Sequence, residues 1–547
     1  MKNTFDFHFH LFFKHYMTEG FDQKGNVTTS GIAKILNEVM GGTFDSQSSP
    51  KQISESRLFV GVTSILSLEH AFVNRISKLA QTLPFRWSYV HKIKNGETSY
   101  YDDFIGQVKE CLDAHEWLKG GPFNIDFLNR DDDAWKAKTA ADIEATLTKG
   151  DRRYFAFSIE GGHNLSNVPI HKNIPSRYPE LQLRELQDRA DVDFISINLC
   201  HLSYIPEQTL GGFCQGLNKL TNLAFKSEDF CPKATLGITE RGKKVIQQAL
   251  THQTKPVLID VKHMSVYSRF HYYRIREKLI TEFPDVSRLP VITSHTGFCF
   301  RSLTDFVRRK SFRSTKETSE GYTVTQIESE NISIGKTDDL INKGLFGNPW
   351  TINLFDEEIT EIMRSNGMIG ISLDQRILGA AGILPDSIRD PHFEGEIIAQ
   401  PEWERLFRDG QLPTAERLPE GLAPSREERH AMILCLHLIH AVRVGYATVA
   451  WSGDASPWDH LCVGSDFDGL INPINVVSNV TDVHKLRDHL LQYLPQAEKT
   501  LPFYKDTKAL KRLENGAIDR NYMEAVVDKF MFSNGVKFIA RFLRNWS

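Results

Sequence analysis

The sequence has few cysteines, and they show no pairing pattern. Its seven cysteines are an odd number, scattered from Cys111 to Cys462, and no Cys-x-x-Cys pair occurs. This distribution excludes a zinc ribbon and a thioredoxin-like dithiol, because both need closely spaced cysteines. It favours buried free thiols in a reducing compartment.

Long apolar runs are also missing. No stretch approaches the roughly 20 apolar residues of a membrane span. The apolar run at the start, MKNTFDFHFHLFF, is interrupted by an aspartate and two histidines, unlike the core of a signal peptide. We therefore expect a cytoplasmic protein without a membrane span.

The chain has no excess of charge of either sign. Lys and Arg number 65 against 69 Asp and Glu, so the formal net charge is −4 over 547 residues. So small a value argues against a basic nucleic-acid surface and against an acidic tail. The hydrophobic (41%) and charged (24%) fractions are those of an ordinary soluble protein, which excludes a disordered chain and a coiled coil.

Short apolar runs typical of buried strands recur along the chain, with helical patterns between them. Fully apolar strands of this length fit a parallel sheet covered on both faces, and the alternation of strands and helices predicts an α/β fold. A barrel of eight parallel strands needs about 250 residues. The runs are 5–9, 154–159, 194–199, 256–261, 291–293, 368–373 and 461–464.

We expect one barrel domain over residues 1–547, with insertions at about 17–150, 299–350 and 377–430. The first insertion includes a helix-like segment at 64–81. The second has a basic run followed by Ser, Thr and Asn, and the third is rich in Pro, Glu and Arg.

Two histidines share one face of the first predicted strand. In FDFHFH, His8 and His10 lie two positions apart and point the same way, while the phenylalanines face the packing layer. Two imidazoles on one face at a strand end can chelate a divalent ion. Incidental histidines on an N-terminal strand are the alternative.

Further candidate ligands follow later apolar runs. They are Glu160 in SIEGG, His263 in DVKHMS, His295 in TSHTG and Asp466 in GSDFDG. Each alone also fits a core histidine or a capping carboxylate. Together they predict one site, because the C-terminal strand ends of a barrel converge on one face.

The residue types indicate the chemistry of such a site. Four imidazoles and one carboxylate suit Zn²⁺ or another borderline divalent ion, and five ligands suit two ions that share a bridging carboxylate and a bridging water. The ions would lower the pKa of that water and make hydroxide available for attack on a carbonyl. Asp466, as a carboxylate that is not a ligand, could accept the proton and pass it to the leaving amine.

These motifs resemble those of the membrane (renal-type) dipeptidases, metallopeptidases of the amidohydrolase superfamily. They run from residue 5 to residue 543 in the family's order, and the three insertions have no counterpart. The matching stretches are FDFHFH, FAFSIEGGHNL, FISINLCHLS, GITERGKKVI, PVLIDVKHMS, VITSHTG, TINLFDEEITEIMRSNGMIGISL, DHLCVGSDFDG and NGVKFIARFL.

The resemblance implies a distorted (β/α)₈ barrel with a two-zinc site. His201, in NLCHLS, falls on the histidine that binds substrate and polarises the scissile carbonyl. Asp466 falls on the aspartate that orients the catalytic water and shuttles its proton. The implied metal ligands are His8, His10, Glu160 as the bridge, His263 and His295.

Two positions depart from the family pattern. The family usually has His-x-Asp at the first motif, so His10 replaces an anion by a neutral ligand. The family also has an Arg-Asn pair before the helix that begins DEEI, where Arg is expected to hold the substrate carboxylate. Here the pair reads Ile352-Asn353, and an aliphatic side chain cannot replace a guanidinium. Either an arginine of the insertion substitutes (Arg301, Arg308 or Arg309), or the substrate is not a free dipeptide.

The sequence thus predicts a zinc-dependent hydrolase of amide or peptide bonds, dipeptidase-like, that acts on a dipeptide or another small molecule. Two alternatives remain open. One is an amidohydrolase for a lactone, a cyclic amide or an acylated amine, and the other is a catalytically silent metal-binding scaffold. No nucleic-acid partner is expected, and a homodimer is an open alternative. His437 and His440, in an apolar helix-like stretch, are interpreted as structural.

Overall fold

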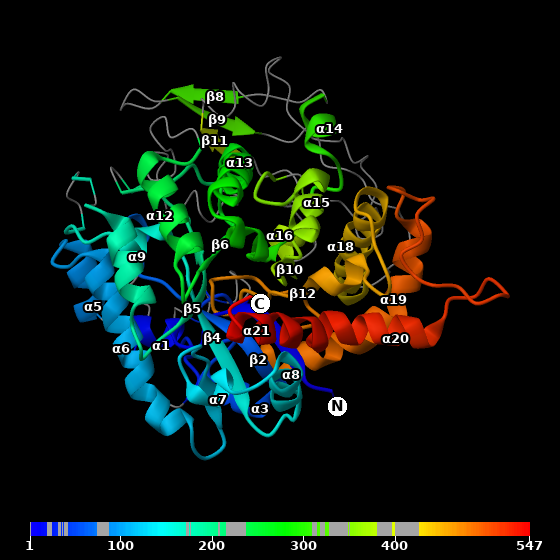
Figure 1. Ribbon diagram of the computed structural model, residues 1–547, viewed down its shortest axis with the longest axis horizontal. Coiled ribbons are helices and arrows are strands. Elements are labelled where there is room, and N and C mark those ends of the chain that lie inside the picture. Colours follow the sequence, from blue (N-terminus) through cyan, green and yellow to red (C-terminus); the bar gives the residue numbers. More distant parts are fainter. Residues whose placement is uncertain are drawn as a thin grey trace.

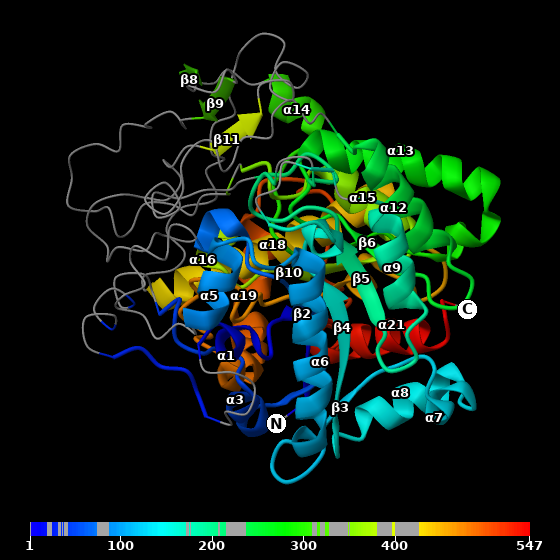
Figure 2. The ribbon, with the colours of Figure 1, turned by 90° about the vertical axis from the view of Figure 1, so that its left-hand side faces the viewer.

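The computed structural model describes most of the chain (Figures 1 and 2). The residues outside the description are 1, 19–24, 31–33, 35–36, 38–41, 74–86, 171–173, 176, 206–207, 215–236, 309–313, 318–322, 328–347, 349, 380–395, 400–425 and 547.

Eight strands follow one another in the central sheet, and each pair of neighbours is parallel. A ninth strand, β3 (Ile125–Phe127), pairs in parallel with β4 outside this series. In order, the eight are β1 (Thr4–Phe9), β2 (Leu58–Ile65), β4 (Arg153–Ile159), β5 (Phe194–Asn198), β6 (Leu258–Asp260), β7 (Ile292–Thr296), β10 (Met368–Ile371) and β12 (Leu461–Val463).

The first and last strands of this series meet and close the sheet. The backbone nitrogen of Asp466, after β12, donates to the carbonyl of His8 at 2.8 Å. The nitrogen of His10 donates to the carbonyl of Phe467 at 2.9 Å, and Phe9 forms a parallel bridge with Phe467. The predicted α/β barrel of eight parallel strands is therefore confirmed.

Helices surround the strands, as Figures 1 and 2 show. Side-chain caps start two of them: Thr239 accepts from the nitrogen of Gly242 before α12, and Ser265 accepts from that of Ser268 before α13. The main covering helices are α6 (Tyr100–Leu118), α9 (Pro179–Gln187), α12 (Glu240–Thr251), α13 (Val266–Glu282), α15 (Asp356–Arg364), α18 (Arg426–Thr448), α19 (Leu486–Thr500), α20 (Arg520–Asp528) and α21 (Asn534–Leu543).

The segment 17–150, expected as an insertion, contains part of the barrel. Strand β2, the barrel's second strand, lies within it. The helix expected over 64–81 is wrong at its start, because Ser64 and Ile65 end this strand. Gly61, Thr63 and Ser64 interrupt the apolar run of β2, which makes its signal weaker than that of the other strands. Residues 74–81 of the expected helix lie outside the described residues.

The two later insertions meet in a small antiparallel sheet. Strands β8 (Ser314–Glu317) and β9 (Thr323–Ile327) come from the insertion at 299–350, and β11 (Glu396–Ala399) comes from that at 377–430. Strand β9 lies between the other two. Figures 1 and 2 show this sheet near α14 (Leu303–Arg308), outside the barrel.

One described helix, Glu428–Thr448 within α18, is long and apolar enough to cross a membrane by length and composition. Of the 18-residue stretch of this helix that meets the criterion, 83% is buried inside the molecule. The same burial is found in the core helix of a soluble protein. His437 and His440 of this helix are buried, with Nε2 of His437 2.9 Å from the carbonyl of Leu378 and Nε2 of His440 2.8 Å from Asp356 Oδ1.

Candidate metal centre

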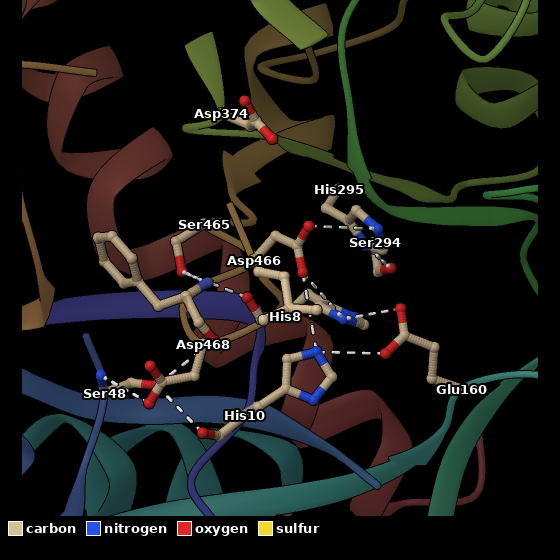
Figure 3. A network of polar contacts seen from close by, with 12 residues as sticks. His8, His10, Ser48, Glu160, Ser294, His295, Asp374, Ser465, Asp466 and Asp468 are labelled. Carbon is tan, nitrogen blue, oxygen red and sulfur yellow. Dashed lines mark hydrogen bonds and ion pairs between the residues drawn. The ribbon is translucent and has the colours of Figure 1, made fainter. Parts of the chain in front are cut away.

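Side chains from the C-terminal ends of six barrel strands meet in one cluster, and Figure 3 shows several of them. Most are buried, and the side chains of His201 and Asp466 keep 11% and 15% of their surface exposed. The members are His8 and His10 from β1, Glu160 after β4, His201 after β5, His263 after β6, His295 in β7 and Asp466 after β12. All seven predicted metal-binding and catalytic residues thus lie together.

Glu160 is the centre of the cluster. Its Oε1 lies 3.4 Å from Nε2 of His8, 3.4 Å from Nε2 of His263 and 3.5 Å from Nε2 of His201. Its Oε2 lies 3.2 Å from Nε2 of His10. One carboxylate therefore faces four imidazoles from three strands, with its two oxygens directed to different histidines.

Asp466 lies on another side of the histidines. Its Oδ1 is 3.8 Å from Nε2 of His8 and 3.7 Å from Nε2 of His10, and its Oδ2 is 3.9 Å from Nε2 of His295. The Nε2 atoms of His295 and His263 are 3.2 Å apart. Two protonated nitrogens at this distance would repel each other. Two unprotonated nitrogens at this distance can both bind the same cation.

Several of these atoms form no hydrogen bond with the described residues although they are buried. They include both ring nitrogens of His8 and His10, Oε2 of Glu160 and Nδ1 of His263. Leaving buried polar atoms without partners is costly, so a bound ligand is expected. Ligand atoms of three groups lie within 4.8 Å of one another: His8–Glu160–His295, His8–His10–Asp466 and Glu160–His201–His263. The donor set fits divalent cations.

The electrostatics also favour cations. Burial lowers the pKa of His263 to about 3 and lowers that of His295, so both rings keep free lone pairs at neutral pH. Burial alone would lower the pKa of His10, but the charges of Glu160 and Asp466 outweigh it and raise the pKa to about 9. Negative charge is therefore concentrated where His10 meets the two carboxylates.

Tight backbone geometry holds Asp466 in place. Asp466 and Asp468 have φ angles of 65° and 66°, in the left-handed region that aspartate tolerates better than most residues. A Cβ at Gly469 would lie 2.0 Å from Oδ1 of Asp466, so this position has no room for a side chain. The loop is also fixed to the N-terminal strand, because Ser465 donates from its nitrogen and its hydroxyl to Asp6.

His201 has a partner that the sequence did not indicate. Glu69, buried in the segment after β2, accepts a hydrogen bond from Nδ1 of His201. Burial would raise the pKa of Glu69, but its bonds and the charge of His201 lower it to about 2. The charges of Glu160 and Glu69 outweigh burial and raise the pKa of His201 to about 10.

Besides His201, the predicted substrate-binding residues are Ile352 and Asn353, which lie beside the loop that follows His295. Ile352 packs in a small apolar cluster with Cys214, Trp350 and Ile377. The side chain of Asn353 braces the loop: its Oδ1 accepts from the nitrogen of Gly297 at 3.2 Å, and its Nδ2 donates to the carbonyl of Ile377 at 2.9 Å. Their contact with substrate remains a prediction.

The arginines considered as substitutes are only partly described. Arg301 is buried, and its carbonyl accepts from the nitrogen of Asp356. Arg308 ends α14, its side chain lies outside the description, and so does all of Arg309.

No family model matches the chain, and a search of curated proteins finds no match. Solved structures do. A dipeptidase described as a metallopeptidase of family M19 is 13% identical with a TM-score of 0.41, and the match covers 97% of this chain and 99% of that one. A probable dipeptidase from Pseudomonas aeruginosa is 14% identical with a TM-score of 0.43, covering 100% and 94%.

A third solved structure is a metallopeptidase from Rhodobacter sphaeroides, liganded with a phosphinate mimic of the dipeptide L-Ala-D-Ala. It is 13% identical with a TM-score of 0.42, and the match covers 96% of this chain and 99% of that one. These proteins are of the class that the motifs resemble. At such identities the similarity concerns the fold, and the chemistry of the site follows from this chain's own residues.

Proposed function

We propose that the protein is a metal-dependent hydrolase of amide bonds in small substrates, of the membrane-dipeptidase type. The observation that supports this most directly is the position of Glu160, whose two oxygens face four histidines of three different strands while Asp466 lies across from them. A buried carboxylate in this setting suits a bridge between two cations.

The proposed ligands divide into two sets that share Glu160. His8 and His10 would hold one ion, and His263 and His295 would hold the other. Zinc is the proposed metal because imidazole-rich sites with few carboxylates suit it. When bound, such ions supply a water whose pKa is lowered toward neutrality.

Asp466 is the proposed proton carrier. Burial raises its pKa, which suits a group that accepts the proton of the nucleophile and then releases it to the leaving amine. Its Oδ1 faces His8 and His10 and its Oδ2 faces His295, so it borders both proposed ion positions.

His201 is the proposed group that polarises the scissile carbonyl. Its Nδ1 is bonded to Glu69, so its Nε2 is directed toward Oε1 of Glu160 at 3.5 Å. A donor held in this way can stabilise negative charge that develops on the carbonyl oxygen.

Metal analysis and a substrate panel test the proposal together. The purified full chain should bind close to two zinc ions by elemental analysis and hydrolyse a dipeptide. Glu160→Gln should reduce bound metal, and Asp466→Asn should retain metal but lose more than about 99% of turnover, as expected for removal of an acid–base group.

A histidine far from the centre provides the control. His252 pairs with Asp188 on the surface, so His252→Gln should keep both metal and activity. Full hydrolysis after removal of metal, or a chain that binds no zinc, would contradict the proposal. Metal binding without hydrolysis of any amide, lactone or acylated amine would favour the silent scaffold instead.

A further inference from the structure

The segment 66–70, which carries Glu69, is held by side chains of other elements. Its backbone groups bond to side chains of α6 and of the turn that follows β4. Such bonds fix the path of a segment that is neither helix nor strand. They join the carbonyl of Leu66 to Nε2 of Gln107 (2.8 Å), the nitrogen of Ser67 to Oδ1 of Asn164 (2.9 Å) and the nitrogen of His70 to the hydroxyl of Tyr100 (3.0 Å).

The peptide directly before Glu69 is held by a tyrosine of α5 (Trp87–Lys94). The hydroxyl of Tyr89 accepts from the nitrogen of Leu68 at 3.3 Å and donates to Oδ2 of Asp103 at 3.2 Å. Tyr89 and Asp103 are both buried. Burial raises the pKa of Tyr89 well above its ordinary value, so the hydroxyl keeps the proton that it donates.

A second tyrosine bonds to the same carboxylate. Tyr16 of α1 (Phe13–Thr18) donates to Oδ1 of Asp103 at 2.6 Å, and its ring lies 4.3 Å from that of Tyr89. Helices α1, α5 and α6 lie side by side, as Figures 1 and 2 show. Asp103 thus joins the three helices, and Tyr89 extends this network to the backbone of Leu68.

We propose that Tyr89 is a positioning residue for the reaction: it fixes the peptide before Glu69, whose carboxylate holds the ring of His201. Oε1 of Glu69 accepts from Nδ1 of His201 at 3.1 Å, so a shift of the segment would move that ring. Helix α5 lies between two of the motifs shared with the dipeptidases, in a part of the chain without such a motif, so the resemblance does not predict this contact. The inference rests on the proposed function, because a positioning role needs a reaction.

Steady-state kinetics on the zinc-loaded full chain tests the role, with L-alanyl-L-alanine as the substrate. Tyr89→Phe keeps the ring and removes the hydroxyl. Its kcat should fall about three- to tenfold, the range expected when one hydrogen bond is lost. Its KM should stay within about twofold of wild type, because His201 acts on charge that develops in the transition state.

Tyr16→Phe is the matched control. It removes the other tyrosine hydroxyl from Asp103 but leaves the bond between Tyr89 and Leu68. Its kcat should therefore stay within about twofold of wild type. A loss of stability common to both variants is measured by thermal unfolding, and the kinetics are compared at a temperature where both are folded.

A double-mutant cycle separates positioning from a general structural role. Glu69→Ala removes the carboxylate through which Tyr89 is proposed to act. Adding Tyr89→Phe to Glu69→Ala should change kcat by less than about twofold, because residues that act through one contact are not additive. A purely structural role of Tyr89 would instead lower kcat by the same factor in both backgrounds.

Hydrogen exchange at the amide of Leu68 tests the contact without substrate or metal. In the wild type this buried amide should be protected. In Tyr89→Phe it should exchange at least about tenfold faster, because its partner is lost, whereas Tyr16→Phe should leave its rate within about threefold of wild type.

Each outcome decides one of the two proposals. The role of Tyr89 is overturned by equal falls of kcat in Tyr89→Phe and Tyr16→Phe, by additive losses in the cycle, or by an unprotected Leu68 amide in the wild type. A zinc-loaded wild type that hydrolyses no amide would overturn the proposed function alone, and the exchange of Leu68 would then decide whether Tyr89 holds the segment.

Discussion

Oε1 of Glu69 accepts two hydrogen bonds from neighbouring residues, one from Nδ1 of His201 at 3.1 Å and one from the backbone nitrogen of Leu202 at 2.9 Å. A single buried oxygen thus fixes both the ring of His201 and the peptide that follows it. Because Nδ1 of His201 donates to Glu69, its Nε2 points toward Glu160 in the metal centre and is left for the substrate.

Removing the charge of Glu69 should slow catalysis more than it weakens binding. Glu69→Gln keeps an oxygen that can accept both bonds, so kcat should fall about tenfold with KM nearly unchanged. Glu69→Ala should lower kcat by about a further tenfold, because losing a donor that stabilises charge on the carbonyl oxygen lowers kcat by about 10²–10³. Steady-state kinetics on the zinc-loaded enzyme measures both. Asp126→Asn is the matched control, because Asp126 pairs with His115 in the same way near β3. An equal loss in the control would contradict a specific role.

Restoring an anion at the first motif should strengthen metal binding. His10→Asp places a negative charge beside Oε2 of Glu160 and Oδ1 of Asp466, where a divalent cation gains attraction when bound and repulsion between carboxylates grows when it is absent. The affinity for zinc should rise by about tenfold, or about 1.4 kcal/mol, in a chelator competition. His10→Asn removes the imidazole without adding charge and should weaken binding, which separates the two effects.

Asp103 should make stability depend on pH. Burial raises the pKa of its carboxyl group, which accepts from the hydroxyl of Tyr16 at 2.6 Å. In the unfolded chain an aspartate has a pKa of about 3.9. The folded state holds the proton more tightly, so its contribution is complete below that pH and is lost as the pH rises through the folded pKa.

Asp103→Asn removes this titration. The difference in the free energy of unfolding, variant minus wild type, should therefore be constant below about pH 4 and increase as the pH rises above it. Urea unfolding at a series of pH values measures this difference. Asp113→Asn, at an exposed position paired with Lys109, should show no such trend. A parallel pH dependence in wild type and Asp103→Asn would refute the assignment.

Close packing of α21 on β1 should make Gly535 intolerant of a side chain. A Cβ there would lie 2.1–2.3 Å from ring atoms of Phe5, so Gly535→Ala should destabilise the protein by about 1–3 kcal/mol or more through overpacking. Gly106 in α6 has open space around its would-be Cβ, so Gly106→Ala should stabilise by about 0.5–1 kcal/mol instead. Thermal unfolding of both variants compares the two directions.

Much of the fold and of the site could be predicted, because both depend on strands. The apolar runs indicated seven of the eight barrel strands, and residues at their C-terminal ends had to converge once the sheet closed. Strand β2 was missed because Gly61, Thr63 and Ser64 dilute its apolar run. Its omission made part of the barrel look like an insertion.

Glu69 could not be assigned from the sequence, because its role depends on a contact rather than on a local pattern. Glu69 reaches His201 across 132 positions, and no strand signal marks it.

The antiparallel sheet β11–β9–β8 makes two distant insertions depend on each other. Strand β11 pairs only with β9 among the described strands, with Ala399 opposite Val324. Trimming the chain at either place alone would expose a strand edge, which invites pairing with other molecules. A shortened version for crystallisation should therefore delete both segments or keep both.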